Sequence, residues 1–107
     1  MPIFTSNPAV AYNEDMKWNK EAIFDALGDA TRRRILDELS ERDEQTLYEL
    51  TARLVMKHRL AISRQAIAKH LSRLEAAGLV KSVKRGKFRV IKFDREPLQH
   101  LLDEWLK

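Results

Sequence analysis

The sequence predicts a mainly α-helical domain with one small β-hairpin, and three observations lead to this prediction. Apolar residues recur at helical spacing over most of the chain. The stretch 63–79 begins with a good helix N-cap, carries one apolar face and ends near Gly78. From residue 79 to residue 93 the helical pattern is replaced by β-branched and aromatic residues on either side of Gly86. Helices followed by such a hairpin indicate a winged helix–turn–helix, which we expect to be dimeric.

Length and composition limit the possible classes of protein. A chain of 107 residues with 44% hydrophobic residues is suited to a single domain with a real core. It holds no cysteine, which excludes disulfides and thiolate metal sites. No apolar run is long enough to span a membrane, and the N-terminus lacks the pattern of a signal peptide. We therefore expect a cytoplasmic protein with no membrane partner.

The N-terminal part divides into an arm and two helices. Residues 1–15 are polar and show no period, so we expect an arm that is draped over the fold or a plain flexible tail. Residues 16–107 form the predicted domain. Its first helix covers about 16–27, and Asp29 is a natural N-cap for a second helix at about 30–41. Arg32, Arg33 and Arg34 point about 100° apart on that helix, so we expect one to pair with an acid and another to reach phosphate.

Two further helices form the predicted helix–turn–helix. After a polar connection at 40–45, Thr46 and Glu49 have the spacing of a capping box and open a positioning helix. Residues 56–62 link it to the helix that Ser63 caps, whose apolar face holds Ile67, Leu71 and Leu74. The opposite face is basic and carries an amide, Gln65. Such a face suits an element that enters the major groove of DNA, whereas a plain solvated surface is the alternative.

The charge of the chain is unevenly placed. Between Ser63 and Phe93 there are nine Lys and Arg residues and one acid, Glu75, which gives this stretch a net charge of +8. Since the whole chain carries +4, the remainder is acidic. A basic half that coincides with the candidate recognition helix indicates a polyanionic partner.

The predicted hairpin has strands at 79–83 and 88–93 and a basic tip at 84–87. A basic hairpin directly after a recognition helix is placed to contact the DNA backbone or the minor groove, as a wing does. The alternative is a charged edge that resists aggregation. Together, the helix and the hairpin give these candidate DNA contacts: Ser63, Arg64, Gln65, Lys69, His70, Arg73, Lys84, Arg85, Lys87 and Arg89. For His70 the alternative is a packed structural histidine.

The C-terminal stretch 96–107 predicts one more helix, with Pro97 in its first turn. This helix carries more apolar surface than a domain of this size is expected to bury. We therefore expect it to form a dimer interface with the first helix, unless it only completes the core of the monomer. The candidate interface residues are Trp18, Leu98, Leu101, Leu102, Trp105 and Leu106.

Three segments together resemble the ArsR-type (arsenic-repressor-like) winged helix–turn–helix regulators. They read FDALGDATRRRIL at 24–36, SRQAIAKHL at 63–71 and EAAGLV at 75–80. The resemblance covers roughly residues 22–106. It implies a homodimer of bacterial or archaeal type that represses transcription at an inverted-repeat operator, with base readout by the helix from Ser63 and with the hairpin as the wing.

The sequence departs from that family pattern in three places. Ala30 stands where the family usually has proline, and the link before Ser63 is longer than the usual tight turn. The metal-sensing residues are missing, because the positioning helix reads ELTARL at 49–54 without the cysteine box. His100 and Asp103 could share a metal, but two ligands do not make a tight site, and a solvated surface pair is the expected arrangement. We therefore expect neither a metal nor a cofactor.

These features predict a sequence-specific DNA-binding transcriptional regulator, a repressor whose effector is left open. The alternative from another class is a winged-helix module for protein interaction without specific DNA binding. An enzyme is not expected, because the chain has no nucleophile–base signature and no glycine-rich phosphate loop, and its three histidines are scattered.

Overall fold

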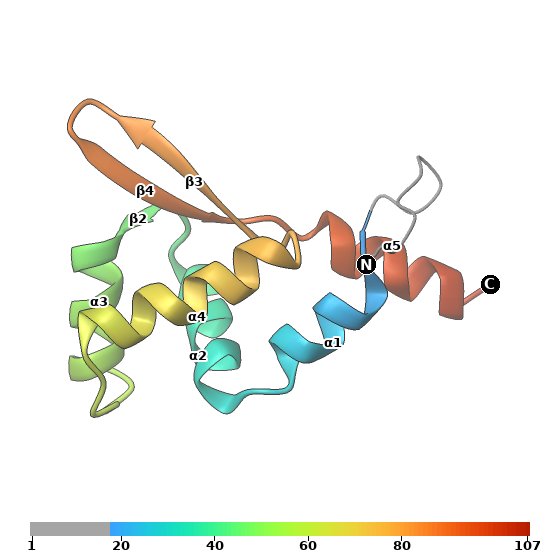
Figure 1. The fold of residues 1–107 in the computed structure, drawn as a ribbon, viewed down its shortest axis with the longest axis horizontal. Helices are drawn as coiled ribbons and strands as arrows, with labels where there is room; N and C mark the ends of the chain where they lie inside the picture. The colour runs from blue at the N-terminus through green and yellow to red at the C-terminus, as the bar shows by residue number, and fades with distance from the viewer. Residues whose placement is uncertain (1–17) are drawn as a thin grey trace, which may run out of the picture.

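The computed structural model describes residues 18–107, so the predicted arm at 1–15 lies outside the described residues. The chain forms a helical body from which an antiparallel hairpin projects (Figure 1). The expected fold class is confirmed: the protein is a mainly helical winged helix–turn–helix. Its elements are α1 (Lys20–Leu27), α2 (Ala30–Glu41), β2 (Gln45–Thr46), α3 (Leu47–Met56), α4 (Arg64–Ala76), β3 (Val80–Arg85), β4 (Phe88–Phe93) and α5 (Glu96–Trp105).

Side-chain caps open helices α1 to α4, whereas α5 begins without one. Asp29 accepts from the Arg32 backbone N–H at 3.1 Å and opens α2. Thr46 and Glu49 form the predicted capping box at the start of α3. The first helix begins at Lys20, later than the expected residue 16, because the Asn19 side chain accepts from two N–H groups of its first turn. Each cap satisfies backbone donors that have no partner inside the helix.

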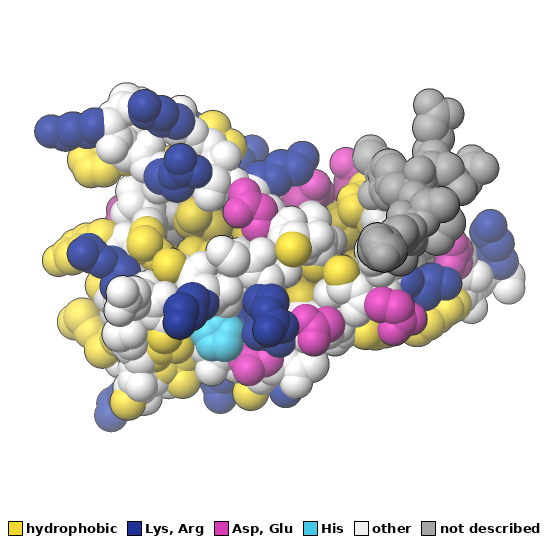
Figure 2. All heavy atoms as spheres, viewed as in Figure 1, with side chains coloured by type: hydrophobic (Ala, Val, Ile, Leu, Met, Phe, Trp, Pro, Cys, Tyr) yellow, Lys and Arg dark blue, Asp and Glu magenta, His cyan; other side chains and the backbone are white. Residues whose placement is uncertain are grey.

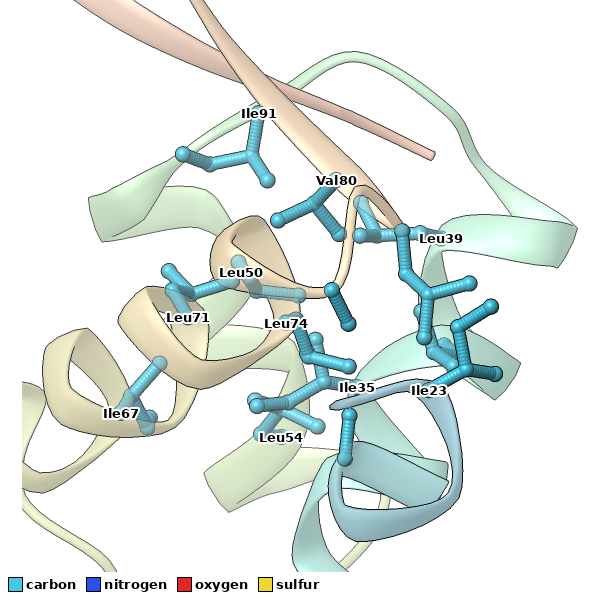
Figure 3. Packing of buried hydrophobic residues seen from close by; sticks show 14 of the residues in the cluster. Ile23, Ile35, Leu39, Leu50, Leu54, Ile67, Leu71, Leu74, Val80 and Ile91 are labelled. Atoms are coloured by element: carbon cyan, nitrogen blue, oxygen red, sulfur yellow. The ribbon is translucent and has the colours of Figure 1, made fainter. Parts of the chain in front are cut away.

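One hydrophobic core joins all five helices to the base of the hairpin. Figure 3 shows core residues of α1 to α4 and of the two hairpin strands. The predicted apolar face of α4 is buried in it through Ile67, Leu71 and Leu74. Ile23 of α1 and Ile35 of α2 reach the same core from the other side of the bundle. Because burial of a large aliphatic side chain contributes about 1.5–3 kcal/mol, this shared core fixes the recognition helix to the body.

A short strand, β2, includes Gln45, although the sequence predicts only a polar connection at 40–45. The sheet order is β2–β4–β3, with Gln45 opposite Ile91 and Thr46 opposite Val90. Gln45 is 1% exposed, although glutamine is ordinarily a surface residue. A strand of two residues has no periodicity to detect, and its burial depends on a partner strand distant in the sequence.

The hairpin is longer than expected. β3 continues to Arg85, so Lys84 and Arg85 are strand residues, opposite Arg89 and Phe88 respectively. Only Gly86 and Lys87 form the turn, and Gly86 has a positive φ of 60° that suits a two-residue hairpin. Within residues 18–107, no helix has both the length and the apolar character needed to cross a bilayer.

Candidate nucleic-acid interface

The recognition helix α4 presents its polar front to solvent. Ser63 caps it by accepting from the Ala66 N–H at 3.1 Å. Arg64, Gln65 and Lys69 are exposed on the side opposite the buried apolar residues. At the other end Gly78 has a φ of 79°, the left-handed conformation predicted for the residue after the helix. The geometry therefore leaves the N-terminal half of α4 accessible to a partner.

Two other predicted contacts on α4 are engaged with the protein itself. The Arg73 guanidinium lies 2.9 Å from the Asp25 carboxylate of α1. The half-buried His70 ring places Nδ1 3.2 Å from Arg32 Nη1. Because a guanidinium can only donate, this contact favours the tautomer in which the His70 proton is on Nε2.

The arginine triplet behaves differently from the prediction of an internal pair with an acid. Arg32 is buried, and its guanidinium donates to the carbonyl oxygens of Ala26 at 2.8 Å and Asp25 at 2.9 Å. Arg33 also donates to a backbone carbonyl, that of Leu27. The last carbonyl groups of α1 lack the i+4 partners of a continuing helix, and these side chains supply donors to them, in addition to the Gly28 N–H that donates to Asp25. The sequence places basic residues just after the end of α1, but it does not indicate that their side chains fold back onto the carbonyl groups of that helix.

The wing carries exposed basic residues close to its turn. Lys84, Lys87 and Arg89 are all exposed. Arg85 is also exposed but pairs with Glu44, with Nη2 and Oε1 2.7 Å apart. Figure 2 shows basic side chains on the wing and along α4 on one and the same face of the molecule. The fold thus places the basic residues of α4 and those of the wing on one face.

A buried carboxylate, which the sequence analysis did not identify, supports the segment that leads to α4. Glu38 of α2 is fully buried, and it accepts from Gln45 Nε2 at 2.9 Å. Its other oxygen lies 3.0 Å from His58 Nε2 and 3.5 Å from Lys57 Nζ. Desolvation by burial raises the pKa of Glu38, but the hydrogen bonds from Gln45 and His58 and the charges of Lys57 and Arg53 together outweigh it, so the pKa lies below the ordinary value.

This carboxylate joins three elements that surround the recognition helix. Gln45 belongs to β2, while Lys57 and His58 follow α3 in the link before α4. The long link noted in the sequence is a loop that follows α3, and Arg59 has a positive φ of 60° within it. Its backbone is held further by the Leu60 N–H, which donates to the Leu54 carbonyl at 3.0 Å. Glu38 therefore fixes a loop that is otherwise irregular.

The predicted dimer residues fall into two groups. Leu101 is 6% exposed and lies in the core of the monomer, and Trp18 and Leu98 are half-buried beside that core. By contrast, Leu102, Trp105 and Leu106 are 48%, 58% and 78% exposed. Leu102 lies about 100° around α5 from the buried Leu101 and faces away from the core, whereas Trp105 shares the face of Leu101 but is the last residue of the helix.

An apolar surface patch remains on α1 and α5. The Trp105 ring stacks on Phe24 of α1, with the ring centroids 5.6 Å apart. Leu102 lies one helical turn before Trp105 and Leu106 on α5, and we call these three residues together with Phe24 the α1–α5 patch. A patch of this kind indicates an interaction site, since monomeric proteins rarely expose large apolar surfaces.

The candidate metal pair does not come together. His100 Nε2 lies 3.5 Å from Glu104, and its ring packs on Trp18, with centroids 5.3 Å apart. Asp103 instead accepts from the Gln99 side chain at 2.8 Å. Among the described residues, no group of three or more histidines and acids is placed to hold a metal ion.

The chain is similar in sequence to helix–turn–helix proteins. A model of a helix-turn-helix domain family matches residues 27–83. The uncharacterized HTH-type transcriptional regulator YuzN of Bacillus subtilis (strain 168) is 65% identical over 92 residues, which are 86% of this chain and 100% of that protein.

Solved structures of similar proteins cover most of the chain. The crystal structure of an ArsR family transcriptional regulator shares 28% identity and a TM-score of 0.65 over 91% of this chain and 89% of its own. An ArsR-like transcriptional regulator from Rhodococcus sp. RHA1 shares 40% identity and a TM-score of 0.68 over 79% of this chain and 72% of its own.

Proposed function

The chain belongs to the ArsR family of helix–turn–helix transcriptional regulators, and from this premise we propose that it is a repressor that binds an inverted-repeat operator as a homodimer. It is a regulator and not an enzyme. The observation that carries the proposal is the common basic face of α4 and the wing (Figure 2). In this arrangement α4 reads base edges in the major groove, and the wing contacts the adjacent backbone.

The position of each residue on α4 or on the wing indicates its role in DNA recognition. Arg64 and Gln65 occupy the first turn of α4, where side chains that enter the groove usually lie, and Lys69 follows one turn later. Lys84, Lys87 and Arg89 neutralise phosphates from the wing. His70 and Arg73 contribute mainly to the placement of α4, because both contact groups of α1 or α2 in the protein.

The homodimer is proposed to form through the α1–α5 patch. A two-fold axis places the same surface of both subunits together, so it covers Phe24, Leu102, Trp105 and Leu106 at once. It also sets two recognition helices about 34 Å apart, which is one turn of DNA. Each subunit then reads one half of the operator. In this proposal the protein acts in the cytoplasm, where it binds the chromosome. It requires neither a metal nor another cofactor for this binding.

Selection of bound fragments from genomic DNA, followed by footprinting of the recovered sites, tests this proposal. We expect protected half-sites related by two-fold symmetry, and a log Kd that rises steeply with log salt as counterions are released. Recovery of random fragments, or binding that does not change with salt, would contradict specific DNA recognition. Salt-independent binding would instead favour the alternative of a protein-interaction module with apolar contacts.

A further inference from the structure

A groove separates the start of α3 from the end of the wing. Tyr48 and Glu49 lie on its helical side, and Lys87, Phe88 and Arg89 lie on its hairpin side. Both aromatic rings are open to solvent: Tyr48 is 71% exposed and Phe88 is 57% exposed. We call this feature the Tyr48–Phe88 groove. It lies at the end of the molecule that also holds the start of α4 (Figure 1).

The rings of Tyr48 and Phe88 do not contribute to the packing of the core. Neither residue belongs to the hydrophobic core or packs against it, and Phe88 pairs with the exposed Arg85 at the end of the hairpin. Exposed aromatic side chains leave a large apolar area in water, and each ring loses few rotamers when a partner covers it. Their position on facing walls of one groove indicates a partner that lies between them.

The charged residues that line the groove indicate which kind of partner it binds. Lys87 and Arg89 stand on the hairpin wall, and Lys87 Nζ lies 6.0 Å from the centre of the Phe88 ring. The one carboxylate in the groove, Glu49, accepts from the Thr46 N–H at 2.9 Å, so its charge is turned toward the backbone. Cations beside apolar rings suit a chain that alternates anionic and apolar units, as the sugar–phosphate backbone of DNA does.

We propose that the Tyr48–Phe88 groove seats one sugar–phosphate strand of the DNA, beside the major groove that α4 enters. The deoxyribose rings pack against Tyr48 and Phe88, and the neighbouring phosphates pair with Lys87 and Arg89. This inference rests on the proposed function and adds an apolar, sequence-independent contact to it. The wing then holds DNA by contact with sugars as well as by charge.

The test compares three single variants with the wild type on an operator fragment and on random duplex DNA over a range of salt concentrations. Tyr48→Ala and Phe88→Ala remove the rings, while Met56→Ala removes a 76% exposed side chain at the end of α3, outside the groove. Circular dichroism and thermal melts establish that each variant is folded. Because all three residues are largely exposed, we expect folding to be preserved.

The expected result is an affinity loss of about tenfold for each ring, because roughly 50 Å² of apolar surface is no longer buried. The loss is equal on operator and random DNA, the slope of log Kd against log salt is unchanged, and Met56→Ala binds as the wild type does. Phe88→Leu, which keeps an apolar side chain, recovers most of the affinity.

Three outcomes would overturn the inference. Wild-type affinity in both ring variants would show that the groove faces away from DNA and serves another partner. A flattened salt slope would show that the rings only orient the neighbouring cations, and a loss confined to the operator would make them base-reading groups. If the wild type itself fails to bind DNA, the proposed function fails, which is a result distinct from these three.

Discussion

Arg32 Nη1 of α2 lies 3.2 Å from His70 Nδ1 of α4, while the same guanidinium donates to the carbonyl oxygens of Asp25 and Ala26. One buried side chain therefore joins the end of α1 to the recognition helix. Arg73 makes a second connection to α1 through Asp25. The helix that carries Phe24 of the α1–α5 patch and the helix proposed to read DNA are thus held in a fixed relation.

Replacement of Arg32 tests how strongly this connection stabilises the fold. Arg32→Met keeps the apolar stem but leaves two carbonyl groups without their charged donor, which costs about 3 kcal/mol in the free energy of unfolding. Arg34→Met, at an exposed position two residues further along α2, should change it by less than about 0.5 kcal/mol. Urea denaturation measures both, and equal stability of the two variants would contradict the structural role of Arg32.

Glu38 should make stability depend on pH. Its pKa is lower in the folded protein than the ordinary value of 4.5, so it stabilises the fold above pH 4.5 and loses this effect as the pH falls through its folded pKa. We expect Glu38→Gln to lower the free energy of unfolding by about 2 kcal/mol at pH 7, and the difference from wild type to narrow below pH 4.

The matched control for Glu38 is Glu41, an exposed residue that pairs with the same Lys57. Because surface ion pairs contribute little, Glu41→Gln should change stability by less than about 1 kcal/mol. Denaturation curves of all three proteins between acid and neutral pH provide the comparison. A constant difference between Glu38→Gln and wild type at every pH would refute the linkage.

Gln65 is the residue for which we predict base readout. Gln65→Ala should weaken binding to the selected operator by about 1–3 kcal/mol and leave binding to random DNA unchanged. Its exposed position in the first turn of α4 is the reason. Titrations of both DNA duplexes at one salt concentration measure the effect, and an equal loss on the two would assign Gln65 to the backbone.

The wing should contribute to affinity through charge. Alanine at Lys84, Lys87 and Arg89 together should lower affinity for all sequences and reduce the slope of log K against log salt by about one unit per lost phosphate contact. Arg85→Ala should have a smaller effect, because Arg85 pairs with Glu44 in the protein. An unchanged slope in the triple variant would mean that these wing residues do not touch phosphate.

Two substitutions on α5 separate dimerisation from folding. Trp105→Asp places a charge on the exposed α1–α5 patch and should give a folded monomer with much weaker operator binding. Leu101→Asp places a charge in the core and should unfold the domain, since an unpaired buried charge costs several kcal/mol. Sedimentation equilibrium measures assembly and circular dichroism measures folding. A wild-type protein that sediments as a monomer would contradict the proposed homodimer.

The local features of this protein can be predicted from its sequence. The caps at Asp29, Thr46 and Ser63, the left-handed Gly78 and the apolar face of α4 all follow from residues within one or two turns of each other. The charge of the stretch 63–93 could also be counted directly. These interactions form between residues that are close in the sequence, so they do not depend on how the rest of the chain packs.

The contacts between segments that are distant in the sequence follow only from the tertiary structure. It buries Glu38 among Gln45 and the link after α3, turns Arg32 toward carbonyl groups, and pairs Arg73 and Arg85 with acids. It also places Leu101 inside the core while Leu102 stays exposed. A sequence pattern states which groups are polar or apolar, but the partner of each group depends on packing between elements, and that packing determines which cations remain available to DNA.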